Sequence, residues 1–188
     1  QLESQLVDHV ILSLCYKHEV VIDWLRGKAF TFKVSWVIEQ APLGTGGAIK
    51  YALKKSKQPE VFVLNGDSYF DISLQSILNN ATPNIQAVIA LKEMKNFSRY
   101  GTVILDANNT ITQFKEKAPK ESGLINTGVY LLLNKNIDWS AYPEKFSFEK
   151  DFLEIAGENQ LLKGFVNEGI FIDIGIPEDY EKAQSMFK

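Results

Sequence analysis

The sequence predicts an α/β fold: a Rossmann-like, mixed but mostly parallel sheet with flanking helices and an antiparallel hairpin insertion. Short apolar segments alternate with amphipathic stretches, the pattern of repeated strand and helix units. In the middle of the chain two apolar runs instead flank residues 106–110, whose Asn and Asp residues favour a hairpin turn. With 188 residues, 45% of them hydrophobic, one core is expected, so residues 1–188 are predicted to form a single domain.

The expected elements follow in chain order. Strands are predicted at residues 9–14, 33–38, 61–64 and 86–92, with helices at 19–26, 47–55 and 74–79. The hairpin would pair residues 102–105 with 111–116, and an apolar strand at 129–133 follows it. Ser147 is a candidate N-cap for a helix at 148–156, with Phe148, Phe152, Ile155 and Ala156 on one face. A strand at 170–174 precedes a helix that begins near Pro177.

Composition excludes several classes of partner and compartment. The net charge of −3 and a pI near 5.5 give no basic field for nucleic acid, and the apolar runs are too short to cross a membrane. The single cysteine, Cys15, cannot form an internal disulfide and has apolar neighbours, so we expect a buried thiol in a reducing cytoplasm. The sequence leaves a homo-oligomer open.

Common catalytic motifs are also missing. His9 and His18 have no cysteine or acidic cluster at ligand spacing, which argues against a zinc site. Neither a Gly-x-Ser-x-Gly elbow nor a Gly-Lys-Ser/Thr phosphate loop occurs. A dinucleotide fingerprint at residues 44–49 is weak, because Ile49 stands where the third glycine belongs.

Residues 44–47, Gly-Thr-Gly-Gly, stand directly before the helix expected from about Ala48. Glycines allow the backbone to approach a ligand closely, and a helix N-terminus presents free N–H groups to polar or anionic atoms. The alternative is a turn that only caps the helix.

Two aspartates are associated with apolar strands. Asp67 follows the strand at 61–64, and Asp173 lies within an apolar run where an unpaired charge would be costly. A shared Mg²⁺ would satisfy both carboxylates and suit phosphoryl or nucleotidyl transfer. The alternative is two unrelated hydrogen-bonded carboxylates.

A further group of polar residues lies between these acids in the sequence. Glu116, Asn126 and Thr127 could read sugar hydroxyls, and Lys117 could hold a phosphate. Taken singly, Glu116 and Lys117 are more simply a solvated pair, and residues 126–128 a strand bulge.

Six motifs, in order, resemble the sugar-1-phosphate nucleotidyltransferase family over almost the whole chain. They are Glu39-x-x-Pro42-Leu43-Gly44-Thr45-Gly46-Gly47-Ala48, Asn65-Gly66-Asp67, Arg99-Tyr100-Gly101, Phe114-x-Glu116-Lys117, Ile125-Asn126-Thr127-Gly128-Val129-Tyr130 and Asp173-Ile174-Gly175-x-Pro177-Glu178-Asp179-Tyr180. Residues 146–153 and 46–49 look most like the branch that transfers guanylate to heptose 1-phosphates.

The resemblance implies the nucleotide-diphospho-sugar transferase fold and the reaction of a nucleoside triphosphate with a sugar 1-phosphate, giving an NDP-sugar and pyrophosphate. GTP with D-glycero-D-manno-heptose 1-phosphate or mannose 1-phosphate is the expected pair. It further implies that Asp67 and Asp173 bind Mg²⁺ and that Lys117 lies near the sugar phosphate. The nucleotide is expected at Leu43, Gly44, Thr45, Gly46, Asn65 and Gly66, and the sugar at Tyr100, Gly101, Glu116, Asn126 and Thr127.

The sequence departs from the family in one respect. The family opens with a strand, a Gly-Gly-x-Gly-Thr-Arg phosphate loop and a Pro-Lys-Pro segment, and none of them occurs here. Because that loop holds the triphosphate, we expect the chain to be a fragment or residues to precede Gln1. We also expect the strand at 9–14 to lack a partner, and the 188 residues alone neither to fold tightly nor to transfer nucleotides.

Other functions remain as alternatives. A glucose-1-phosphate thymidylyltransferase, or an enzyme for another base and sugar pair, would share these motifs. A non-catalytic sugar-nucleotide-binding regulatory module has little use for two metal-binding acids such as Asp67 and Asp173. A glycosyltransferase usually carries an Asp-x-Asp motif, which residues 67–69 do not supply.

Overall fold

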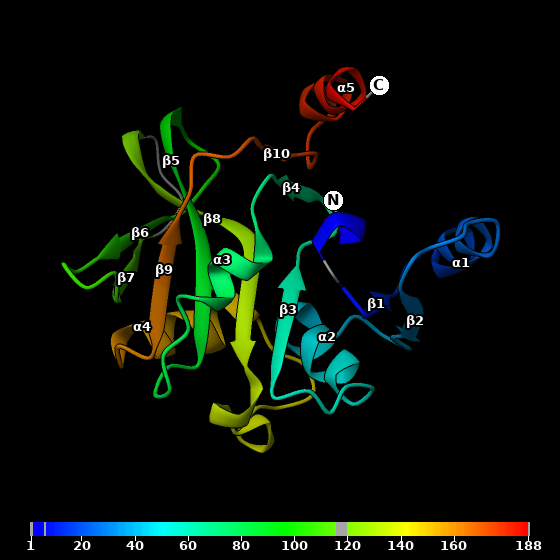
Figure 1. Ribbon diagram of the computed structural model, residues 1–188, viewed down its shortest axis with the longest axis horizontal. Helices are drawn as coiled ribbons and strands as arrows, with labels where there is room; N and C mark the ends of the chain where they lie inside the picture. Colours follow the sequence, from blue (N-terminus) through cyan, green and yellow to red (C-terminus); the bar gives the residue numbers. More distant parts are fainter. Residues whose placement is uncertain (1, 6, 116–119, 188) are drawn as a thin grey trace. The chain divides into compact units, whose positions relative to one another are not determined.

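The computed structural model describes residues 2–5, 7–115 and 120–187 (Figure 1). The chain divides into two compact units, Gln1–Gln58 with Asp138–Leu153, and Pro59–Ile137 with Glu154–Lys188. That residues 1–188 form a single domain stays a prediction.

A parallel strand pair lies in the first unit. β1 (His9–Leu14) pairs in parallel with β2 (Lys33–Ile38), so that His9 lies opposite Lys33 and Leu14 opposite Ile38. Both strands have the predicted bounds. The prediction that residues 9–14 lack a partner is wrong, because α1 (His18–Arg26) is a crossover connection that returns the chain to a parallel position beside β1.

The remaining elements of the first unit are helical. The 3₁₀ turn η1 (Leu2–Gln5) precedes β1, and α2 (Gly44–Leu53) packs on β1 and β2. A second 3₁₀ turn, η3 (Trp139–Ala141), and the π-helix η4 (Phe148–Glu154) follow later in the chain. Aromatic rings hold this later segment together, with Phe148 stacked on Phe152 at 4.9 Å between centroids.

The helix expected at 148–156 differs from the prediction in type and in its buried face. Ser147 acts as its cap, because its hydroxyl accepts a hydrogen bond from the amide of Lys150 at 3.2 Å. The first seven residues form the π-helix, and only α4 (Ile155–Glu158) is α-helical. Phe148 and Phe152 are buried, but Ile155 is 52% exposed. A π-helix has wider turns, with hydrogen bonds between residues i and i+5. Residues four apart, such as Phe148 and Phe152, therefore share the buried face, while Ile155 is rotated away from that face.

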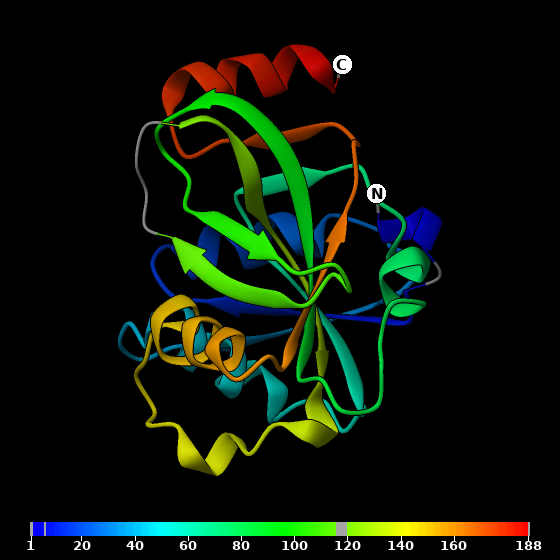
Figure 2. The ribbon, with the colours of Figure 1, turned by 90° about the vertical axis from the view of Figure 1, so that its left-hand side faces the viewer.

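The second unit contains a six-stranded sheet and a two-stranded one. The larger sheet has the order β7 (Ile111–Lys115), β6 (Thr102–Leu105), β8 (Lys120–Leu133), β5 (Ala87–Phe97) and β9 (Leu162–Val166), with β3 (Glu60–Leu64) also on β8. The smaller sheet pairs β4 (Ser68–Phe70) with β10 (Phe171–Asp173). The β6–β7 hairpin was predicted, and its strand β6 pairs with β8 (Figure 2).

The predicted mixed α/β fold is confirmed, but the predicted parallel majority is wrong. Of the seven strand pairings among the described residues, only β1–β2 and β5–β9 are parallel. The difference comes from β8, which runs antiparallel to β3, β5 and β6. An apolar run such as residues 129–133 shows that a strand is buried on both faces without showing its direction.

The core of the second unit lies in the middle of its sheet. Residues 87–91 of β5 are fully buried, as are Leu131 and Leu132 of β8. α3 (Leu74–Leu78) packs on β5, and the hydroxyl of Ser73 caps it by accepting from the amide of Ser76. The 3₁₀ turn η2 (Asn134–Asn136) follows β8, and α5 (Pro177–Met186) begins at Pro177 as predicted.

Two local features differ from expectation. The thiol of Cys15 belongs to a half-buried residue rather than a buried one. α2 begins at Gly44, so the glycine-rich segment forms the first turn of the helix instead of a loop before it. Among the described residues, no helix has the length and apolar character needed to span a bilayer.

Candidate active site

The glycines at the start of α2 are required by close packing within the first unit. Gly44 has a φ of +74°, and a Cβ atom there would lie 2.5 Å from the carbonyl oxygen of Phe146. A Cβ at Gly46 would lie 2.2 Å from the ring of Phe146, and one at Gly47 would lie 2.3 Å from the oxygen of Glu144. Close packing within the protein therefore explains these glycines, which lie inside the first turn of α2 and not in a flexible turn before it.

The same packing determines which amides of this turn can meet a ligand. The amide of Leu43 donates to Oε2 of Glu39 at 3.0 Å. The amides of Gly46 and Gly47 both donate to the carbonyl of Phe146, at 3.1 and 3.4 Å. Within the described part of the chain, the amides of Gly44 and Thr45 have no hydrogen-bond partner. The turn thus presents two adjacent donors at a helix N-terminus, a suitable arrangement for polar or anionic ligand atoms.

In the second unit, strand pairing brings Asp67 and Asp173 together. Asp173 ends β10 and lies opposite Ser68, the residue that follows Asp67. The carbonyl of Asp67 accepts a hydrogen bond from the amide of Ile174 at 2.9 Å. Two acids from distant parts of the sequence are therefore neighbours across an antiparallel pair.

The surroundings of the two carboxylates suit a hard cation. Asp67 is exposed and accepts a 3.3 Å hydrogen bond from the hydroxyl of Ser68, and half-buried Asp173 accepts one of 2.8 Å from the amide of Gly175. Among the described residues neither carboxylate forms an ion pair, so both keep free oxygen lone pairs. One or two carboxylates completed by phosphate and water oxygens are a common Mg²⁺ arrangement, although no cluster of three or more His, Cys, Asp or Glu residues occurs in the described chain.

The residues next to Asp67 differ in what they do. Asn65 packs against Gly128, whose φ is +78°, and a Cβ on Gly128 would lie 2.7 Å from Nδ2 of Asn65. Gly66 has no such neighbour, because a Cβ there would meet nothing within 4 Å among the described atoms. Packing does not explain the glycine at position 66, which leaves room there for a ligand.

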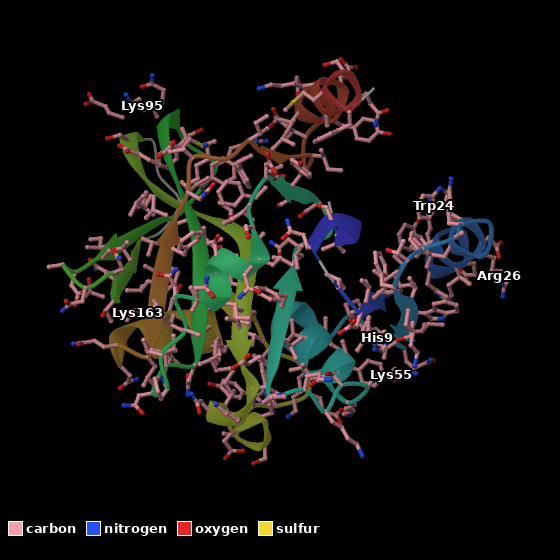
Figure 3. All side chains as sticks on the ribbon, viewed as in Figure 1. His9, Trp24, Arg26, Lys55, Lys95 and Lys163 are labelled. Atoms are coloured by element: carbon pink, nitrogen blue, oxygen red, sulfur yellow. The ribbon has the colours of Figure 1, made fainter. Side chains whose placement is uncertain are left out.

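Tyr100 and Asp173 line one cavity of about 300 Å³ in the second unit. Its wall also includes residues from β5 and α5, among them Lys95, labelled in Figure 3. Burial, followed by the negative charge of Asp173, raises the pKa of the Tyr100 hydroxyl. The phenol therefore keeps its proton at neutral pH and can donate it to a ligand oxygen. Gly101 follows in the chain and is half-buried.

Arg99 and Asp179 form an ion pair beside Tyr100. Nη2 of Arg99 donates to Oδ2 of Asp179 at 2.5 Å and to the hydroxyl of Tyr100 at 3.0 Å. This pair links the loop before β6 to the first turn of α5. Sequence reasoning placed both residues within motifs but assigned them no role, since only the fold brings the motifs together.

The bulge alternative for residues 126–128 is confirmed. Leu91 lies opposite Asn126 and Ile89 opposite Tyr130, so β8 has extra residues facing Ala90. Thr127 is 1% exposed, and its hydroxyl donates to the carbonyl of Ala90 at 2.8 Å. That contact gives the Thr127 side chain a structural role within the bulge.

Asn126 is the more accessible of the two predicted sugar residues in this bulge. Its Nδ2 donates to the hydroxyl of Tyr130 at 2.8 Å, and its Oδ1 accepts from the amide of Gly128 at 3.0 Å. These bonds fix the side chain of Asn126 while leaving one amide proton for a ligand. The predictions for Glu116 and Lys117 fall outside the residues that the structure describes.

Known proteins share both the sequence and the fold. The family model described as Nucleotidyl transferase matches residues 2–188. The chain is 42% identical over 184 residues to D-glycero-alpha-D-manno-heptose 1-phosphate guanylyltransferase of Aneurinibacillus thermoaerophilus, covering 97% of this chain and 80% of that protein. A protein of the same name from Campylobacter jejuni is also 42% identical, over 95% of this chain and 79% of the relative.

A solved structure with a bound nucleotide analogue is similar as well. HddC from Yersinia pseudotuberculosis complexed with GMP-PN is 39% identical, with a TM-score of 0.86, over 100% of this chain and 82% of that one.

Proposed function

Because this chain belongs to the nucleotidyl transferase family, we propose that it transfers a guanylate group from GTP to D-glycero-D-manno-heptose 1-phosphate. The products are the GDP-sugar and pyrophosphate. The single observation that carries the substrate pair is the 42% identity to two heptose 1-phosphate guanylyltransferases over almost the whole chain. Membership also agrees with the resemblance expected from the six motifs, and the family match over residues 2–188 supports a single domain.

In the second unit, Asp67 and Asp173 would hold Mg²⁺. A bound divalent cation neutralises the charge of phosphate oxygens and so lowers the barrier to attack on phosphorus. The lone pairs left on the two carboxylates and their adjacent register support this assignment. Gly175 helps to hold Asp173, because its amide donates to Oδ1 and a Cβ at position 175 would lie 2.9 Å from the same oxygen.

The nucleotide would contact Leu43, Gly44, Thr45 and Gly46 in the first unit, and Asn65 and Gly66 in the second. The amides of Gly44 and Thr45 are the donors that the turn offers. Gly66 provides the open backbone position.

The sugar phosphate would lie against Tyr100, Gly101, Glu116 and Asn126, with Lys117 near its phosphate and Thr127 supporting the bulge. The protonated hydroxyl of Tyr100 is a donor for a sugar oxygen. A phosphate oxygen of the sugar 1-phosphate attacks the α-phosphorus of GTP and forms a new bond to it. The bond from the α-phosphorus to the oxygen that bridges to the β-phosphate breaks, and pyrophosphate leaves. Since that oxygen is already ionised, no protein nucleophile or general base is needed, and the residues act by positioning and charge neutralisation.

The experiment is a Mg²⁺-dependent assay of pyrophosphate release with the full-length product of the gene that encodes this chain, its mass verified. GTP, dTTP, UTP and CTP are each combined with heptose, mannose and glucose 1-phosphates. We expect release with GTP and the heptose phosphate, and less with GTP and mannose 1-phosphate. Release confined to dTTP and glucose 1-phosphate would make the chain a thymidylyltransferase, and silence across the panel would favour the binding module. The single, free cysteine is consistent with a cytoplasmic enzyme, because disulfides are rare in a reducing compartment.

A further inference from the structure

Glu149 makes a side-chain contact with the glycine-rich turn that the proposed chemistry does not use. Its Oε2 accepts a hydrogen bond from Oγ1 of Thr45 at 2.7 Å and another from the hydroxyl of Ser147 at 3.0 Å. All three residues belong to the first unit. One carboxylate oxygen of this half-buried side chain therefore accepts hydrogen bonds from two hydroxyl groups.

These contacts fix the orientation of the Thr45 hydroxyl. Its proton goes to Glu149, and its oxygen accepts a hydrogen bond from the amide of Phe148 at 2.9 Å. A hydroxyl that both donates and accepts within the protein cannot rotate freely. The side chain of Thr45 is thus held, and with it the backbone at the start of α2.

The backbone that Thr45 belongs to carries the turn's two unpartnered donors, the amides of Gly44 and Thr45. The rest of the turn is tied to Phe146 by main-chain bonds, including one from the amide of Phe146 to the carbonyl of Leu43 at 3.1 Å. Main-chain bonds survive side-chain substitution. Glu149 is therefore the acceptor through which this arrangement can be altered by mutation without changing the turn itself.

The local backbone around Glu149 is unusual in a second, independent way. Glu149 is the second residue of the π-helix η4, and π-helices are rare and often found at functional sites. Asp151, on the same helix, accepts from the amide of Ser147 at 2.7 Å and closes the start of the helix. The two acids therefore have different roles: Asp151 caps its own helix, and Glu149 contacts Thr45.

We propose that Glu149 is a positioning residue for the nucleotide. It acts through the Thr45 hydroxyl to hold the amides of Gly44 and Thr45 in the geometry that receives GTP, and this inference rests on the proposed function. A negative charge near a triphosphate opposes binding, so the acceptor oxygen of Glu149, and not its charge, is the useful feature. A glutamine keeps an acceptor oxygen with two lone pairs at the same place.

The test measures the KM for GTP, the KM for the sugar phosphate and kcat for E149A, E149Q and the control D151A. For E149A we expect the KM for GTP to rise roughly tenfold, with the other two parameters within about twofold, because about one hydrogen bond of positioning is lost. E149Q is expected to restore the KM for GTP to within about threefold of the wild type. D151A loses a helix cap without touching Thr45, so its melting temperature falls while its KM for GTP stays unchanged.

Three results would overturn the assignment: an unchanged KM for GTP in E149A, an equal rise in both KM values, or a D151A effect as large as that of E149A. If E149A does not fold, E149D replaces it, because the shorter side chain withdraws the acceptor from Thr45 and predicts the same selective rise. Calorimetric binding of a non-hydrolysable GTP analogue without sugar provides a second readout. An inactive wild type would contradict the proposed function instead, while an active wild type with an unaffected E149A contradicts only the role of Glu149.

Discussion

The main-chain carbonyl of Asp67 accepts a hydrogen bond from the amide of Ile174 at 2.9 Å, directly after Asp173. The bond extends the short β4–β10 pair by one step, so the two aspartates occupy adjacent positions of one antiparallel ladder. This main-chain hydrogen bond fixes the backbone positions of the two aspartates without using their carboxylates. The carboxylates therefore remain available to a cation and to the phosphate groups that it would carry.

Removing either charge should abolish turnover while leaving the fold intact. Asp67→Asn and Asp173→Asn are each expected to lower Mg²⁺-dependent pyrophosphate release by about 100-fold or more, because the cation supplies several kcal/mol of charge stabilisation. The melting temperature should stay unchanged or rise, since two adjacent carboxylates repel each other when no cation is bound. Asp71→Asn is the control, an exposed acid of the same unit that should keep full activity. Undiminished turnover in both variants would refute the metal role.

Two glycines should respond to alanine in opposite ways. Gly66→Ala meets nothing within 4 Å, so its free energy of unfolding should change by less than about 0.5 kcal/mol while the KM for GTP rises. Gly44→Ala combines a φ of +74° with a Cβ placed 2.5 Å from a main-chain oxygen, so we expect a loss of about 2 kcal/mol or more. Thermal denaturation and GTP titrations measure the two effects. A Gly66→Ala variant with wild-type kinetics would remove that position from the nucleotide site.

Tyr100→Phe should weaken sugar-phosphate binding by about five- to tenfold in KM, the value of one hydrogen bond, with the KM for GTP unchanged. Burial and the charge of Asp173 raise the pKa of this phenol above its ordinary value of 10.0, which favours the neutral form. The donor proton is therefore present throughout the physiological range. A plot of kcat/KM for the sugar phosphate against pH should show no fall due to Tyr100 below about pH 10. A phenylalanine variant with an unaltered KM would argue that the hydroxyl serves only Arg99.

Lys117→Ala should raise the KM for the sugar phosphate by about tenfold or more, because a lysine beside a phosphate makes a charge-assisted hydrogen bond. The KM for GTP should change much less. Lys135→Ala, which removes an exposed lysine of the same unit outside the proposed site, is the matched control. Equal kinetics in the two variants would place Lys117 outside the site.

Sequence reasoning located the elements better than their pairing. The bounds of β1 and β2 agree with prediction residue for residue, because alternation and apolar content are local properties. The direction of β8 and the partner of β1 depend on how distant segments meet, which periodicity does not encode. The π-helix η4 was missed for a related reason, since residues 148–156 fit a helix without showing its turn width.

In the candidate site, too, the sequence predicts single residues better than the contacts between distant segments. Asp67 could be predicted because it follows an apolar strand, and Asp173 because a charge within an apolar run needs a partner; the fold places the two together. The ion pair of Arg99 with Asp179 could not be predicted, because each residue is an ordinary surface charge when considered alone. The sequence pointed to the glycines of the turn as ligand contacts, but close packing requires them independently of any ligand: Phe146 excludes a Cβ at Gly44 and Gly46, and Glu144 excludes one at Gly47.

The most direct measurement follows the α-phosphorus of GTP. The full-length protein is incubated with Mg²⁺, heptose 1-phosphate and GTP labelled at the α-phosphate, and the products are separated and identified by mass. The account predicts that the label appears in the GDP-heptose while unlabelled pyrophosphate is released in equal amount. Label found only in GTP, GMP or GDP, with no GDP-sugar formed, would contradict nucleotidyl transfer as the function of this protein.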